Sequence, residues 1–343
     1  MIYAMPTGPV NDQVTVVIEW PENEIEALYG SAWPEETDVT KQVGVQKLGE
    51  TSKAWNDTDR NSATASVVVT DYGTTVYARL FDGTNYTAKN ISLTVYNIDK
   101  VPPEGTVVIN SGAEETLDQD VTLTLSATDN RTEEGYGVKW FYASEEENPD
   151  LTKVNWIDYT GNPMNYTFNL SPSNTNAARV AKVNVWYKDA AQNISEKTSD
   201  TIILVSGVAR LVEGSTTTYH ATLKDAINTA SKDSLANASK ITLLRNIQQE
   251  GTFNIVEGQN ILIEMNGKVI TQTSNAAITA IKNAGILAIR NAEGATTSNI
   301  TVTTTSGNAI GIYNTGLLDI DDVSVIVTAP SGTAMAIHNE NIK

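Results

Sequence analysis

The sequence predicts a mainly β protein with two β-sandwiches in tandem, followed by the N-terminal part of a right-handed parallel β-helix with a capping α-helix. Short β-branched and aromatic runs, separated by Gly, Asn, Asp and Pro turns, fill roughly the first two hundred residues, which is typical of sandwiches. A pattern there repeats after about 100 residues, and a shorter pattern after residue 207 repeats at the spacing of solenoid coils. We therefore expect domains over residues 1–100, 101–206 and 207–343.

The two predicted sandwiches share one order of features. A tryptophan precedes a long strand, which ends in an Asp turn and leads to a final strand: Trp55, 76–82 and 91–95 in the first, and Trp156, 183–189 and 201–204 in the second. A repeat of this length indicates tandem domains rather than a solenoid. The linker between them, residues 97–103, ends in two prolines, which exclude a helix and favour an extended connection. We place the first boundary there.

Residues 219–230 form the one convincing helix. Leu223, Ala226, Ile227 and Ala230 fall on one of its faces. Thr222, followed three residues later by Asp, resembles a capping box. Because the first coil of a solenoid exposes an apolar end, we expect this helix to cover it.

The predicted β-helix carries a repeat centred on asparagine. Asn283, Asn314 and Asn339 lie 31 and 25 residues apart, within the range of solenoid coils. Asn and the neighbouring Gly suit a tight corner with left-handed backbone geometry, and stacked corners can form an asparagine ladder of side-chain amide hydrogen bonds. The sequence stops within a repeat, so we expect the β-helix to be truncated here and the native protein to continue.

Three motifs relate the second predicted sandwich to a known family. D-x-x-P-P spans residues 99–103, V-x-L-x-L-x-A-x-D spans 121–129, and D-x-A-x-N-x-S spans 189–195. Together they resemble the bacterial immunoglobulin-like repeats of clostridial and other Firmicutes cell-surface proteins, although Gln192 stands where that family often has Gly. The resemblance covers residues 97–205 and, more loosely, 9–99. It implies immunoglobulin-like sandwiches on an extracellular bacterial protein.

A second resemblance covers residues 217–343. A T-L-x-x-A-I helix at 222–227, an I-T-L-L strand at 241–244 and an M-N-G-K turn at 265–268 follow one another. This order is similar to the opening of pectate-lyase-like right-handed β-helices on Firmicutes surface proteins, where the turn reads L-N-G-K. The resemblance implies the β-helix fold for this part of the chain.

Composition excludes several classes of partner. The formal net charge of −18 argues against nucleic acid and anionic membranes, because both bind Lys and Arg. Without cysteine the chain has neither disulfides nor thiolate metal sites.

No segment is long and apolar enough to insert into a bilayer, and the first residues do not form a signal peptide. We expect an extracellular protein, secreted or attached to the cell wall, whose signal and anchor lie outside this chain.

Four residues beside predicted turns are candidate calcium ligands: Asp99, Asp129, Asp189 and Asn193. Their side-chain oxygens are of the kind that calcium binds, and such sites often stiffen the linkers of surface modules. The alternative is that they are only turn-forming residues, since no contiguous loop signature such as an EF-hand occurs. We expect no other cofactor. Two histidines and no cysteine argue against zinc.

The six tryptophans allow two interpretations, because rings can fill a core or stack on sugars. The recurrence of Trp55 at Trp156 favours the sandwich cores for most of them. Trp33 lies in a stretch rich in Pro and Glu, and we expect its ring to be exposed. It is therefore the candidate ligand-binding residue.

The predicted β-helix contains one tight acidic group, Asp319, Asp321 and Asp322. Sugar cleavage needs two carboxylates at a set separation, and the first two share a strand face. Fold alone does not give function, so we interpret the group as an ordinary solvated strand and turn, with no catalytic residues in this segment.

We therefore expect a non-enzymatic surface or adhesion protein. Its sandwiches act as spacers or binding modules, and its β-helix contacts a host or environmental glycan, a protein or a cell-wall polymer. The alternative is the accessory and N-terminal part of a carbohydrate-active enzyme, a polysaccharide lyase or hydrolase, whose catalytic coils lie beyond residue 343.

Overall fold

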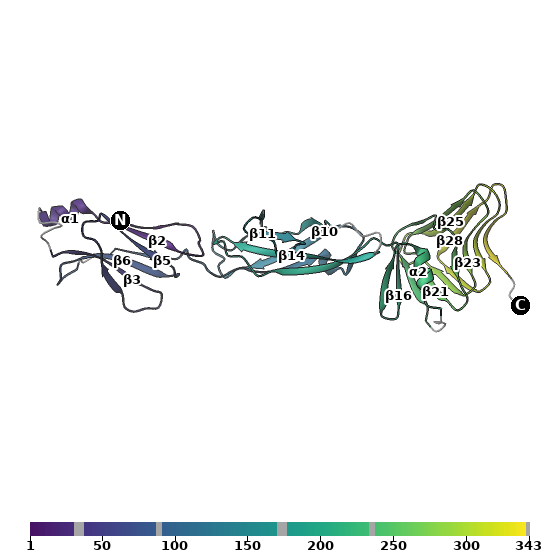
Figure 1. Cartoon of the computed structure of the whole chain (residues 1–343), viewed down its shortest axis with the longest axis horizontal. Coiled ribbons are helices and arrows are strands. Elements are labelled where there is room, and N and C mark those ends of the chain that lie inside the picture. The colour runs from purple at the N-terminus through teal and green to yellow at the C-terminus, as the bar shows by residue number, and fades with distance from the viewer. Residues whose placement is uncertain (31–37, 87–90, 170–176, 233–236, 341–343) are drawn as a thin grey trace. The chain divides into compact units, whose positions relative to one another are not determined.

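A computed structural model of the chain describes residues 1–30, 38–86, 91–169, 177–232 and 237–340. The protein is mainly β, with two sandwiches, a β-solenoid and, in the described part, two short α-helices, α1 (Glu22–Tyr29) and α2 (Leu223–Thr229), as Figure 1 shows. The predicted fold class is confirmed. None of the described helices is long and apolar enough to cross a membrane.

The chain separates into two compact units. The first comprises residues 1–108, 123–164 and 183–200, and the second comprises residues 109–122, 165–182 and 201–343. The second sandwich contributes strands to both units. The domain boundaries at residues 100 and 206 stay predictions.

The first sandwich has a three-stranded and a four-stranded sheet. The smaller has the order β1 (Ile2–Met5), β2 (Val14–Glu19), β5 (Thr64–Val69); the larger has the order β4 (Ala54–Asp57), β3 (Thr40–Gln46), β6 (Thr74–Phe81), β7 (Ile91–Val95). Side chains alternate along β2, so Val14, Val16 and Ile18 point into the core and are fully buried. Helix α1, which lies between β2 and β3 along the chain, is not predicted by the sequence pattern.

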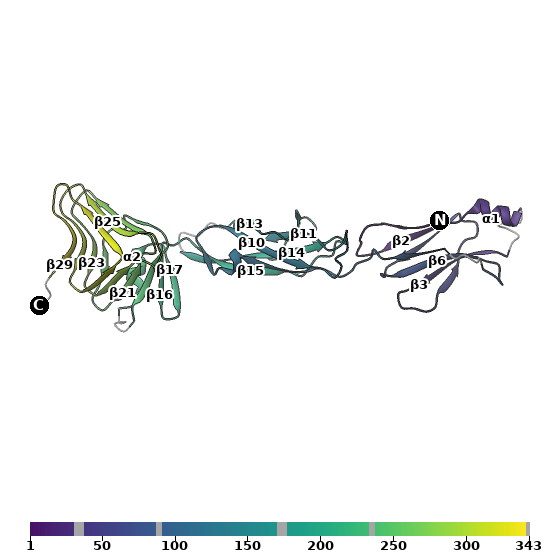
Figure 2. The same cartoon turned by 180° about the vertical axis from the view of Figure 1, so that it is seen from behind.

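The second sandwich also has two sheets, one of three and one of five strands; several of its strands are labelled in Figure 2. One sheet has the order β13 (Met164–Thr167), β10 (Asp120–Thr128), β8 (Glu104–Ile109); the other has the order β12 (Ile157–Asp158), β11 (Val138–Ser144), β14 (Ala178–Asp189), β15 (Thr198–Val205), β9 (Glu115–Thr116). In both sandwiches the strands that correspond to A, B and E of an immunoglobulin fold (β1, β2 and β5; β8, β10 and β13) form one sheet. Those that correspond to C, F and G (β3, β6 and β7; β11, β14 and β15) belong to the other. This pairing is immunoglobulin-like, with a further strand, β4 or β12, beside C; in the second sandwich β9 adds a fifth strand, parallel to β15.

The expectation that the tryptophans fill the cores holds only in part. Trp20 is buried in the first core. Trp55 and Trp156 instead lie outside the cores, where the Arg79 guanidinium carbon is 3.7 Å from the Trp55 ring centroid and the Lys188 ammonium is 4.5 Å from that of Trp156. Each of these two rings is half-buried on the outer face of its sheet, because a stacked cation covers it there.

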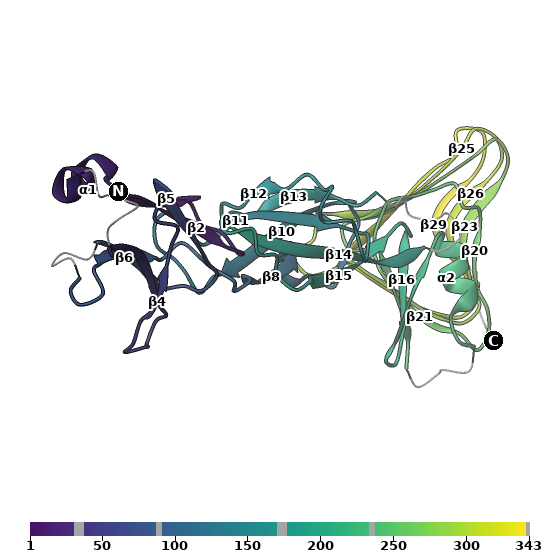
Figure 3. The same cartoon turned by 60° about the vertical axis from the view of Figure 1, so that its left-hand side comes forward.

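The solenoid consists of three parallel sheets, and each of its coils gives one strand to each sheet. The sheets are β18 (Ser239–Leu243), β21 (Asn260–Glu264), β24 (Ile286–Arg290), β27 (Leu317–Asp321); β19 (Ile247–Gln248), β22 (Val269–Ser274), β25 (Ser298–Thr304), β28 (Val323–Thr328); and β20 (Phe253–Ile255), β23 (Ile278–Asn283), β26 (Ala309–Asn314), β29 (Ala334–Asn339). The result is a β-helix of about four turns, seen in Figure 3. The hairpin of β16 (Ala209–Glu213) and β17 (Thr216–His220) extends the first sheet in antiparallel fashion.

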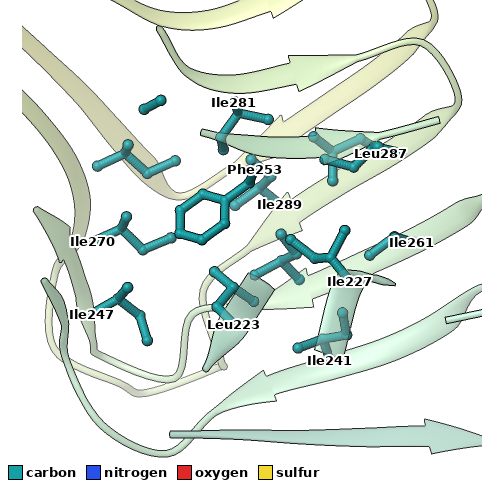
Figure 4. Close-up of a cluster of buried hydrophobic side chains, with 14 of the residues drawn as sticks. Leu223, Ile227, Ile241, Ile247, Phe253, Ile261, Ile270, Ile281, Leu287 and Ile289 are labelled. Atoms are coloured by element: carbon teal, nitrogen blue, oxygen red, sulfur yellow. The ribbon is translucent and has the colours of Figure 1, made fainter. Parts of the chain in front are cut away.

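Helix α2 packs into the apolar core of the first coils, as predicted. Leu223 and Ile227 are fully buried and lie in one cluster with Ile241 and Phe253, drawn in Figure 4. The hydroxyl of Thr222 accepts a hydrogen bond from the Asp225 N–H at 3.0 Å, which confirms the cap. The predicted start of the helix at residue 219 is wrong, because residues 216–220 pair with β16 as strand β17.

The asparagine ladder is confirmed. The register of β23, β26 and β29 places Asn283, Asn314 and Asn339 side by side in successive coils. The Asn283 amide donates to Asn314 Oδ1 at 2.7 Å, and the Asn314 amide donates to Asn339 Oδ1 at 3.0 Å. Because Asn283 and Asn314 are buried, these bonds satisfy polar groups inside the coil corner.

Candidate metal centre

Three of the four predicted calcium ligands come together in the first compact unit. Carboxylate oxygens of Asp99, Asp129 and Asp189, one from each residue, all lie within 4.8 Å of one another. We call this group the three-aspartate centre. Two oxygens that bind one calcium ion at about 2.4 Å are at most about 4.8 Å apart, so this spacing fits a shared ion.

The sandwich topology explains why these residues meet. Asp129 directly follows β10, Asp189 is the last residue of β14, and Asp99 lies in the linker before β8. Successive strands of an antiparallel sandwich reverse direction, so β10 and β14 end at the pole where β8 begins. Residues that are 30 and 60 positions apart along the chain are therefore neighbours at one pole.

The three carboxylates are largely withdrawn from solvent. Asp99 is 4% exposed and Asp189 1% exposed, and Asp129 is half-buried. Burial raises the pKa of Asp129 and of Asp189 above the ordinary aspartate range, and repulsion from neighbouring aspartates raises both further. No ion pair with a basic side chain joins the three carboxylates among the described residues. Buried charges are normally paired or bound to a metal, so this arrangement favours a cation.

Backbone hydrogen bonds orient the three carboxylates. Each accepts one from a residue that follows it: Val101 N–H to Asp99 at 3.1 Å, Arg131 N–H to Asp129 at 3.4 Å, and Asn193 N–H to Asp189 at 2.8 Å. The second oxygen of Asp129, Oδ2, is buried and has no hydrogen-bond partner. An unsatisfied buried carboxylate oxygen is costly, and a bound cation would satisfy it.

Asn193, the fourth predicted ligand, lies beside the three-aspartate centre, where its side-chain amide nitrogen donates hydrogen bonds. This nitrogen donates to the backbone oxygen of Asp99 at 2.9 Å and to Asp189 Oδ2 at 2.8 Å. Asn193 therefore positions two members of the centre. The preceding residue, Gln192, has φ 77°, which lies in the left-handed region that favours Gly.

The linker residue Asp99 has contacts on both sides. Its N–H donates to the backbone oxygen of Val10 in the first sandwich at 2.8 Å, while its own carbonyl oxygen accepts from Asn193 of the second. Asn97 further fixes the linker, since its amide donates to the backbone oxygens of Pro6 and Gly8, both at 2.8 Å. A cation held by Asp99 would therefore act directly on the connection between the sandwiches.

The donor set also selects the metal. The three grouped side chains offer carboxylate oxygens, which suit calcium or magnesium rather than zinc or copper. Calcium tolerates irregular oxygen cages, whereas magnesium demands a near-octahedral shell and keeps several waters. Two buried carboxylates and one half-buried carboxylate, those of Asp99, Asp189 and Asp129, therefore fit calcium best.

The remaining sequence candidates lie elsewhere. Trp33 is outside the described residues, so its ligand-binding role stays a prediction. Asp319 in β27 forms an ion pair with Arg290 at 2.7 Å, in keeping with its interpretation as an ordinary strand residue. Sequence reasoning missed Arg131, whose N–H orients Asp129. Its position two residues after Asp129, within the same turn, is a signal that could have indicated it.

Comparisons with known proteins add little to this description. No family model matches the chain, and no curated protein matches it. Among solved structures, the crystal structure of chicken CNTN1 FN1-FN3 domains matches with a TM-score of 0.29 and 10% identity, over 60% of this chain. The match covers 66% of that chain, just under two thirds of its length, and so low a TM-score assigns neither fold nor function. By its own strand pairing, the chain is a mainly β protein of immunoglobulin-like sandwiches and a β-solenoid.

Proposed function

We propose that this chain is a non-enzymatic segment of an extracellular surface or adhesion protein, with calcium bound at its first linker. The immunoglobulin-like sandwiches serve as spacers or binding modules, and the β-helix presents an elongated surface to its partner. That partner is a host or environmental glycan, a protein or a cell-wall polymer. Spacer modules and a solenoid both suit such a role, because they offer long surfaces on repeated, independently stable units.

The observation that carries the proposal is the three-aspartate centre. Its carboxylates are within 4.8 Å of one another, and Asp99 also hydrogen-bonds to the first sandwich through its backbone N–H. Calcium would offset the repulsion between the carboxylates and hold the linker against the second sandwich. Calcium sites in extracellular modules typically have Kd values of about 10⁻⁴–10⁻³ M. A site in this affinity range fills with calcium outside the cell, in keeping with the proposed extracellular location, secreted or wall-attached.

Isothermal titration calorimetry of the whole chain tests the proposal. We expect one calcium ion per chain, with magnesium binding more weakly. Asp189→Asn removes one carboxylate while keeping its shape, and we expect at least about a tenfold loss of affinity, since losing one charged ligand costs about 1.4 kcal/mol or more. Asp158→Asn is the matched control, because Asp158 is an exposed residue of β12 in the same sandwich. It should leave calcium binding unchanged.

Two results would contradict the proposal. If the unaltered chain binds no calcium, or if Asp189→Asn binds it equally well, the three-aspartate centre is not a calcium site. Turnover of a polysaccharide by the chain removes the non-enzymatic assignment and favours the alternative, a carbohydrate-active enzyme. A glycan array with the same chain identifies the partner class, and binding to an immobilised glycan or surface protein supports the adhesive role.

A further inference from the structure

Arg131 links the three-aspartate centre to the end of the first sandwich. Its backbone N–H donates to Asp129, and its side chain is only 12% exposed. The guanidinium Nη1 donates to the backbone oxygen of Tyr96 at 2.7 Å. Tyr96 follows β7, the last strand of the first sandwich. All of these residues belong to the first compact unit.

Aromatic rings surround the same guanidinium. Its carbon lies 3.7 Å from the ring centroid of Tyr136 and 5.2 Å from that of Tyr72. The Tyr136 hydroxyl also donates to the Tyr96 backbone oxygen, at 3.4 Å, and the rings of Tyr72 and Tyr96 are 5.5 Å apart. One carbonyl of the first sandwich therefore accepts two hydrogen bonds from the loop that follows Asp129.

We infer that Arg131 is the positioning residue through which calcium at the three-aspartate centre stiffens the linker. This inference rests on the proposed calcium function. An ion bound to Asp129 fixes the carboxylate that accepts the Arg131 N–H, and so fixes the start of the loop from residue 130 to residue 136. The ordered loop then places the guanidinium on Tyr96 and between two rings. Without the ion, repulsion among the carboxylates frees Asp129 and with it the loop.

The chemistry requires arginine in particular. A planar guanidinium stacks on a ring and donates hydrogen bonds in its own plane at the same time, whereas a lysine ammonium does so poorly. Both uses occur here, on Tyr136 and on the Tyr96 oxygen. Arg131→Lys should therefore keep the charge near the centre and still lose most of the coupling.

Distances between two spin labels test the inference. The chain has no cysteine, so labels can be attached uniquely at Leu48→Cys and Ile157→Cys, which replace residues that are 68% and 46% exposed. One position lies in the first sandwich and the other in the second. In calcium we expect a narrow distance distribution, and in chelator a broad one. The distance distributions of Arg131→Ala and Arg131→Lys should stay broad even at calcium concentrations that calorimetry shows to saturate the site.

Glu133→Gln is the control, because Glu133 meets the same guanidinium at 3.5 Å from the solvent side and is 61% exposed. Its distance distribution should narrow in calcium like that of the parent chain. If the distance distribution of Arg131→Ala also narrows in calcium, the inference is overturned, while the proposed calcium binding stands. If the parent chain binds calcium but its distance distribution stays broad, the inference fails as well. If the parent binds no calcium, it is the proposed function that fails.

Discussion

Removal of one rung of the asparagine ladder should destabilise the solenoid selectively. The Asn314 side chain accepts from Asn283 at 2.7 Å and donates to Asn339 at 3.0 Å and to the Gly316 backbone oxygen at 3.1 Å. Each such hydrogen bond contributes about 1 kcal/mol net, and Asn314 is only 8% exposed. Asn314→Ala should therefore lower the free energy of unfolding of the solenoid by about 2–4 kcal/mol.

Two spectroscopic signals separate the solenoid from the sandwiches in a urea titration. All six tryptophans lie between residues 20 and 186, so tryptophan fluorescence follows the sandwiches, while far-ultraviolet circular dichroism also follows the solenoid. We expect Asn314→Ala to shift the dichroism transition alone. Asn254→Ala, an exposed asparagine in β20, is the matched control and should change stability by less than about 0.5 kcal/mol. Equal effects of the two variants would refute the energetic role of the ladder.

Three further variants test other parts of the structure. Gln192→Gly should stabilise the second sandwich by about 0.5–1 kcal/mol, because it relieves a positive φ; a lower midpoint in urea would contradict this. Gly316→Ala should destabilise the solenoid by about 1–3 kcal/mol or more, because a Cβ there would lie 2.1 Å from the Gly285 backbone oxygen; an unchanged dichroism transition would contradict it. Burial raises the pKa of Glu250, so the folded state binds the extra proton and stability falls as pH rises above the ordinary glutamate range. Glu250→Gln should flatten that slope and stabilise the solenoid at neutral pH, and a steeper slope in urea titrations at several pH values would contradict this.

Much of the fold could be predicted because its signals are local. Alternation along β2 and the recurrence of Asn283 at Asn314 follow directly from strand geometry and coil period. The outer-face position of Trp55 could not be predicted, because it depends on Arg79 from another strand covering the ring. Helix α1 could not be predicted, because a helix of eight residues is marginal on its own and depends on tertiary contacts.

The candidate site could be predicted in part. Asp99, Asp129 and Asp189 were identified from their residue type and their places beside turns. Their approach to within 4.8 Å depends on strand direction, which a single motif does not encode. The contact between Arg131 and Tyr96 joins residues 35 positions apart through a backbone oxygen. A carbonyl acceptor carries no residue-type signal, so no sequence pattern could indicate this contact.

A crystal structure of the chain grown in calcium tests the central claim most directly. We predict a calcium ion bound by carboxylate oxygens of Asp99, Asp129 and Asp189, at about 2.3–2.6 Å with six to eight oxygen ligands in total. An anomalous difference peak at that place would identify the ion. Ordered water or an empty space between the three carboxylates at saturating calcium would contradict the account.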